Sequence, residues 1–357
     1  MIGNRLKLAR DAAGLSLRAL EEAVDGLVSA QAIGKYENDQ MMPGSDVLLA
    51  LARVLKVSPE YLLSDREVAL SGVDFRKGPA TGAREEKAVE AIVIDHLERY
   101  LEVEDILPDA HLNWAAPRLK ALAISTPEDA EDAAEALRGA WQIGIDPIPS
   151  MAELLEDYGV KVIALDLPQA VSGSKAFARR NGERDVAVIV VNKNHNGERQ
   201  RFTLAHELGH LVLTLQGEAW TDKTAEKACD RFAGAFLVAR SMLYKRLGRV
   251  RTGLSMGELL ELKGLFKVSV SMLVLRCKQL GIISQALFNR LWGQMVRMRW
   301  AGKAAVEPQP CAPEVPTRME RLCLRAATEQ AISDAKAAEL LQISVRTLGE
   351  RLLPAGV

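Results

Sequence analysis

Residues 201–215 read RFTLAHELGHLVLTL, and this stretch places two histidines and a glutamate within an apolar helical pattern. Because an α-helix turns by about 100° per residue, His206 and His210 project from one face, one turn apart. Two imidazoles at this spacing can both bind a single tetrahedral cation such as zinc. Burying them in an apolar helix without such a purpose would be costly. The stretch therefore predicts a helix that carries two metal ligands.

The other members of the predicted site lie on the same helix and on the next one. Glu207 is turned by about 100° from His206, which places it beside the ion as a general base. A catalytic zinc also needs a third protein ligand. Glu226 and Asp230 lie four residues apart in a helical pattern downstream. Glu226 is the predicted third ligand, and Asp230 is predicted to accept the second ring N–H of a ligating histidine. A chance H-E-x-x-H is the alternative, and the downstream pair weighs against it.

These motifs resemble the ImmA/IrrE family of metallopeptidases. The resemblance rests on RQRFTLAHELGHL at 199–211 and EKACDRFA at 226–233, and it extends to DPIPSMAELLEDYGVKVIAL at 146–165 and VIVVN at 188–192. It covers roughly residues 75–290. One departure is Phe-Leu-Val-Ala at 236–239, where the family often has Leu-Leu-Met-Pro, and this change touches no ligand.

The resemblance implies a zincin-like domain that holds one Zn²⁺, or another divalent metal, per chain. It implies that His206, His210 and Glu226 are the ligands, that Glu207 acts in peptide hydrolysis, and that the substrate is an XRE-type repressor. The residue that would stabilise the oxyanion is not identifiable. Lys175 and Arg201 are candidates from their positions alone, and a surface or structural role is the alternative for each.

Residues 2–63 are similar to the XRE, or lambda-repressor-like, helix-turn-helix family. The pattern predicts helix two at Leu17–Val24, a turn, and a recognition helix at Ser29–Glu37, from which Ser29, Gln31 and Lys35 reach DNA. Leu17 replaces the usual glutamine at the start of helix two. Residues 1–65 contain 7 Lys and Arg against 9 Asp and Glu, which weakens the phosphate attraction that drives DNA affinity. A structural bundle, or one that binds another XRE protein, stays open.

Hydrophobic periodicity predicts an α+β fold: an all-α bundle, then a mainly helical domain with a small β-sheet, then a short helical unit. A helix is predicted near 84–103, and strands are predicted within 160–167, 172–180 and 186–192. The predicted domains are 1–66, 67–303 with a catalytic core at 140–245, a Pro-rich linker at 304–317, and 318–357. The last of these contains two short helices around Ile343-Ser344 and resembles a second helix-turn-helix.

Composition excludes several classes of protein and partner. The 357 residues carry a net charge of -1, so a global attraction to nucleic acid or to an anionic membrane is excluded. The four cysteines lack metal or disulfide spacing, and no signal peptide or membrane span is visible, so we expect a cytoplasmic protein with reduced thiols. Residues 262–306 hold eight Lys and Arg and no acid. Such a run typically marks a solvated helical face, and DNA or an acidic substrate is the alternative partner.

Taken together, the sequence predicts a zinc-dependent regulatory peptidase that uses its N-terminal domain to find DNA and cleaves an XRE-type repressor to derepress genes. Two other hypotheses stay open. One is a DNA-binding transcriptional regulator whose metal domain is a sensor or scaffold without hydrolysis, and the other is an antitoxin-like partner that acts by interaction. DNA and a repressor protein are the predicted partners, a membrane is not, and a homodimer is left open.

Overall fold

The computed structural model describes residues 2–63, 68–71, 83–180, 186–217, 220–302 and 305–353. The chain divides into two compact units. The first comprises Met1–Leu112, Ala176–Val186 and Thr317–Val357, and the second comprises Asn113–Lys175 and Ala187–Pro316. In the part of the chain described, no helix is both long and apolar enough to cross a bilayer.

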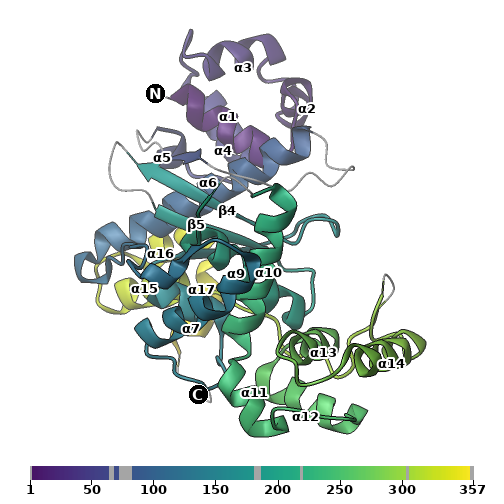
Figure 1. Ribbon diagram of the computed structural model, residues 1–357. Helices are drawn as coiled ribbons and strands as arrows, with labels where there is room; N and C mark the ends of the chain where they lie inside the picture. The colour runs from purple at the N-terminus through teal and green to yellow at the C-terminus, as the bar shows by residue number, and fades with distance from the viewer. Residues whose placement is uncertain are drawn as a thin grey trace. The chain divides into compact units, whose positions relative to one another are not determined.

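The N-terminal bundle of the first unit has the predicted succession of short helices (Figure 1). Its core is built from Leu6, Leu20, Ile33 and Leu51, which are fully buried. Ser16 and Ser29 cap the helices that follow them, because each side chain accepts a hydrogen bond from a backbone N–H of that helix. The helices are α1 (Ile2–Ala12), α2 (Leu17–Ala23), α3 (Ala30–Glu37), α4 (Ser45–Leu55) and α5 (Pro59–Leu63).

Helix α6 (Ala83–Ile106) packs against α1 and against the C-terminal helices within the first unit. Arg5 of α1 forms a buried ion pair with Glu98 of α6. The apolar spacing predicts a buried face with Ala91, Ile92, Ile94, Leu97 and Leu101. This is wrong at Ile92, which is 36% exposed, whereas Val93 is buried. The C-terminal helices are α15 (Arg318–Thr328), α16 (Asp334–Leu341) and α17 (Val345–Leu352), with the predicted turn between α16 and α17.

The predicted strands are present, and the strand order in their sheet is β1-β4-β5-β3. In the second unit β3 pairs in parallel with β5, with Ile163 opposite Val190. In the first unit β1 pairs antiparallel with the later part of β4, with Val68 opposite Arg180. The Gly182 turn that the sequence predicts lies outside the described residues. The strands are β1 (Val68–Ser71), β3 (Lys161–Leu165), β4 (Gly173–Arg180) and β5 (Val186–Asn192).

The described residues of the second unit form eight α-helices, of which α7 and α8 precede strand β3 along the chain and the others follow β5. Helix α7, which was not predicted, packs against α10 and is rich in alanine. Glu131 of α7 accepts hydrogen bonds from Arg276 of α13 and Arg231 of α10, so it ties three helices together. The helices are α7 (Ala130–Ala140), α8 (Met151–Asp157), α9 (Gly197–Val212), α10 (Asp222–Leu237), α11 (Arg240–Leu247), α12 (Met256–Phe266), α13 (Val270–Gln279) and α14 (Gln285–Arg297).

The proline-rich segment has no regular secondary structure over 305–316, as predicted, but it packs onto α9. Glu314 is 6% exposed, forms an ion pair with the buried Arg201, and accepts a hydrogen bond from the Ala152 N–H. A Cβ at Gly197 would lie 2.2 Å from the Ala312 carbonyl oxygen, so only glycine allows this approach. The segment therefore anchors the first half of the helix that carries the two histidines. The predicted domain boundaries stay a prediction.

Candidate functional site

Helix α9 carries His206, Glu207 and His210, and its boundaries follow from its terminal residues. Asn196 caps it by accepting a hydrogen bond from the Arg199 N–H. The predicted helical pattern through Leu215 is wrong at its end, because α9 stops at Val212. Thr214 and Leu215 instead form strand β6 (Thr214–Leu215), which pairs in parallel with β2 (Ala123–Ile124). The end of α9 is thus held by a short β-pairing that local periodicity does not reveal.

Helix α10 presents Glu226 to α9 because the two helices approach closely at Gly209. A Cβ at Gly209 would lie 3.4 Å from the Cys229 Cα and 3.2 Å from the Phe232 ring. A larger side chain would push the helices apart, and Glu226 lies one turn before Cys229. Gly209 is therefore a positioning residue that the sequence analysis did not single out. Its position between His206 and His210 was the one sequence feature that could have indicated this role.

The side chains of His206, His210 and Glu226 converge on one point. The two Nε2 atoms are 3.2 Å apart. His206 Nε2 lies 3.3 Å from Glu226 Oε2, and His210 Nε2 lies 3.3 Å from Glu226 Oε1. Ligands of a tetrahedral zinc with bonds of about 2.0–2.1 Å are separated by about 3.3 Å. The three donors therefore fit a single ion, and they are the one such group in the chain as described.

Asp230 lies one turn after Glu226 and contacts the far side of His206. Its Oδ1 is 2.8 Å from His206 Nδ1, where it accepts the ring N–H. This hydrogen bond leaves the lone pair of Nε2 directed at the convergence point. Cys229 is also close to these acids, but burial, together with the negative charge of Glu226, raises the pKa of its thiol to about 12. Cys229 is therefore a neutral packing residue, because metal-binding cysteines are thiolates.

Three further residues were predicted to lie near the metal, namely Glu207, Lys175 and Arg201, and each has different surroundings. Glu207 is 6% exposed and follows His206 on α9. Lys175 at the start of β4 donates a hydrogen bond from Nζ to the His210 carbonyl oxygen at 3.1 Å. Arg201 is 1% exposed and donates to Glu314 and to the Ile148 carbonyl. Arg201 is thus a structural cation, which was the alternative reading of that residue.

The predicted DNA-contacting residues lie at and on α3, in the first unit. Gln31 and Lys35 are exposed and four residues apart, so they share one face of this helix. Ser29 is exposed, but its hydroxyl already accepts the Ala32 N–H as the helix cap. Ile33 and Tyr36 are buried in the core of the bundle. Gln31 and Lys35 are therefore accessible to a ligand, whereas the Ser29 side chain stabilises the start of α3.

A helix-turn-helix bundle joined to a helix pair with a His-His-Glu group defines a DNA-binding type of regulator fused to a peptidase-like domain. Comparison with protein families agrees with this assignment. Residues 155–278 match the family model described as the IrrE N-terminal-like domain, a peptidase family, and residues 6–62 match that of the helix-turn-helix family. A search of curated proteins gave no match. The chain thus combines an IrrE-like peptidase domain with an XRE-type helix-turn-helix domain, as the sequence resemblance predicted.

Proposed function

We propose that this protein is a zinc-dependent regulatory peptidase that cleaves an XRE-type transcriptional repressor and thereby derepresses genes. The observation that supports this proposal best is the set of separations of 3.2, 3.3 and 3.3 Å among the donors of His206, His210 and Glu226. An Asp–His hydrogen bond behind one ligand is the arrangement that supports metal-binding histidines in proteins. The IrrE-like domain supports peptide-bond cleavage as the reaction.

In this mechanism His206, His210 and Glu226 hold the ion, and Asp230 fixes the orientation of the His206 ring. A divalent metal held there would supply Lewis-acid chemistry, which polarises a carbonyl and favours the ionisation of water. Glu207 accepts a proton from the attacking water as the C–O bond forms. As the C–N bond breaks, Glu207 returns that proton to the leaving amine. The burial of Glu207 limits competition from bulk water for this proton.

The experiment that tests this function is co-expression of the protein with a neighbouring XRE-type repressor. Mass spectrometry of the repressor would give the cleavage site, and elemental analysis of the purified protein would give its zinc content. We expect about one zinc per chain and a single major cut. A protein that holds zinc but leaves every such repressor intact would favour the sensor or scaffold hypothesis instead.

Replacing Asp230 by alanine should weaken the affinity for zinc without removing a ligand. The His206 ring would lose the partner that fixes its tautomer, and such a loss typically weakens metal affinity about 10–100-fold. Competition with a chromophoric chelator would measure the change. Lys227→Ala on the same helix is the control, because Lys227 is exposed and the acids that contact the two histidines are Glu226 and Asp230. Equal affinities in the two variants would contradict the proposed role of Asp230.

We further propose that α3 binds DNA through Gln31, which contacts a base edge, and through Lys35, which contacts a phosphate. Gln31→Ala should relax the preference for one DNA sequence. A glutamine amide can form paired hydrogen bonds with the edge of a base, and such a pair contributes about 1–3 kcal/mol of discrimination against the wrong base. Lys35→Ala should weaken binding to all sequences about equally and reduce the salt dependence, as expected for a phosphate contact. Selection from a pool of random duplexes followed by titration at several salt concentrations would separate the two effects. Unchanged binding in both variants would exclude α3 as the recognition helix.

A further inference from the structure

The segment from α11 to α14 is strongly basic in a chain whose net charge is -1. Residues 240–303 contain thirteen Lys and Arg against two Asp and Glu. One of the two acids, Glu258, accepts hydrogen bonds from the Ser255 backbone N–H and from Arg251, which lower its pKa to about 2. The other, Glu261, is exposed on α12. The cations that no internal acid pairs with are at least partly exposed to water and are accessible to an acidic partner.

Internal ion pairs account for only part of this charge. Lys263 pairs with Glu198 and Arg276 pairs with Glu131, both fully buried, so the predicted solvated face is wrong for these two residues. Arg240 pairs with Glu135 on the surface. The remaining cations in the described part of this segment are exposed or half-buried and have no carboxylate within ion-pair distance. They are Lys245, Arg246, Arg249, Lys278, Arg290, Arg297 and Arg299, together with Lys267, which donates to the Pro149 carbonyl.

Helix α14 orders part of this charge along one face. Arg290, Gln294 and Arg297 are spaced by four and three residues, so they form one stripe. The adjacent face of the helix, turned by about 90° from this stripe, carries Leu287, Leu291 and Met295 and is buried. Arg290 and Arg297 are both exposed. The stripe therefore presents two guanidinium groups to solvent, about 10 Å apart along the helix axis.

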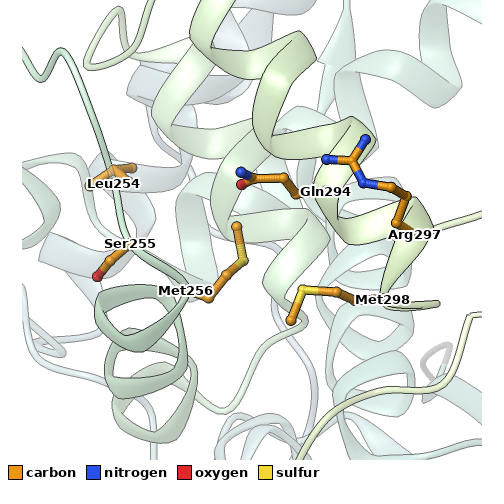
Figure 2. Close-up of a pocket in the computed structure, with 6 residues that line it drawn as sticks. All are labelled: Leu254, Ser255, Met256, Gln294, Arg297 and Met298. Atoms are coloured by element: carbon orange, nitrogen blue, oxygen red, sulfur yellow. The ribbon is translucent and has the colours of Figure 1, made fainter.

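The stripe ends at a cavity of about 390 Å³ between the start of α12 and the end of α14. Leu254, Met256 and Met298 give it an apolar lining, and Ser255, Gln294 and Arg297 complete the wall. Figure 2 shows the side chains of Met256, Gln294 and Met298 directed toward a common space. Met298 is 46% exposed, and thioether side chains adapt readily to different apolar surfaces. The cavity suits a branched or aromatic side chain.

We propose that this surface binds an acidic segment of a partner protein, with one apolar side chain of that segment in the cavity and its carboxylates on Arg290 and Arg297. Charge complementarity favours an acidic partner, since neither Arg290 nor Arg297 has a carboxylate within ion-pair distance among the described residues. The methionine-lined cavity selects a protein segment over DNA, because a phosphate backbone has no apolar group to fill it. Binding here needs no hydrolysis, so it is separable from the peptidase activity.

The test is a selection from a display library of random twelve-residue peptides on the full chain carrying Glu207→Gln, which prevents cleavage. We expect enrichment of peptides with several Asp or Glu around one large apolar residue. Arg297→Glu should weaken an enriched peptide about tenfold by removing attraction and adding repulsion, and Met298→Asp should do the same by placing a charge in the cavity. Arg321→Glu is the matched control, since Arg321 is an exposed arginine in the first unit. Fluorescence anisotropy would give the affinities.

Three outcomes would overturn the proposal. The first is the absence of acidic peptides among those enriched. The second is an affinity that Arg297→Glu and Arg321→Glu change equally, which would indicate a nonspecific charge effect. The third is loss of binding to a random-sequence 20-base-pair duplex in Arg297→Glu and Arg290→Glu while peptide binding is retained, which would make the surface a nucleic-acid site. Circular dichroism would verify that each variant is folded.

Discussion

Glu207→Gln should leave about one zinc per chain in place while it lowers repressor cleavage by about 10²–10⁴-fold. Glutamine has nearly the same shape as glutamate, but it cannot accept the proton that the attacking water loses. The three proposed ligands are untouched, because Glu207 follows His206 on α9 and is not one of the converging donors. Elemental analysis and single-turnover cleavage of the repressor would measure the two quantities on the same sample.

The control for this prediction is the loss of a ligand. His210→Ala and Glu226→Ala each remove a donor that lies 3.3 Å from its counterpart across the metal position. Both should lose most of the zinc and all of the cleavage, because a site with two protein ligands binds zinc far more weakly. If Glu207→Gln also lost the metal, Glu207 would be a ligand. If it kept full activity, the proposed proton transfer would be wrong.

Glu131→Ala should destabilise the second unit by about 3–5 kcal/mol, since it leaves a buried arginine without its counter-ion. Arg276 is 1% exposed and donates two hydrogen bonds of 2.7 Å to Glu131. A third hydrogen bond of 2.9 Å comes from Arg231. Urea unfolding followed by circular dichroism would measure the change in free energy. Asp132→Ala is the matched control, because Asp132 is 73% exposed and its pair with Arg240 should contribute at most about 1 kcal/mol.

The same ion pair gives stability a defined dependence on pH. Burial by itself would raise the pKa of Glu131, but the hydrogen bonds and charge of Arg276, with Arg231, hold that pKa below its usual 4.5. The unfolded chain therefore binds the proton more tightly than the folded chain does. The contribution is fully present above pH 4.5 and is lost as the pH falls through the lower, folded pKa. Arg276→Met with Glu131→Met should remove this dependence, and an unchanged acid transition in that double variant would contradict the assignment.

Local sequence patterns predicted much of the secondary structure because the determining interactions are local. Ser16 and Ser29 sit before apolar runs, where a short hydroxyl side chain can cap the next helix. The β-branched run at 186–192 forms β5 as expected. Helix α7 was missed because alanines, rather than large apolar side chains, form most of its buried apolar face, and α9 was predicted too long because β-pairing ends it. Cap and periodicity signals cannot report a contact with a distant strand.

The candidate metal site also has one part that follows from the local sequence and another that depends on tertiary packing. The spacing of His206 and His210 was determined by the sequence, because the pitch of one helix places residues four apart on one face. The meeting of that face with Glu226 depends on how closely α9 and α10 pack, and Gly209 permits this approach. The same holds for Lys263 and Arg276, whose acids lie 65 and 145 residues away along the chain. Sequence alone determined which residues could act, whereas tertiary packing decided which of them meet, because partners that far apart are joined only when the chain has folded.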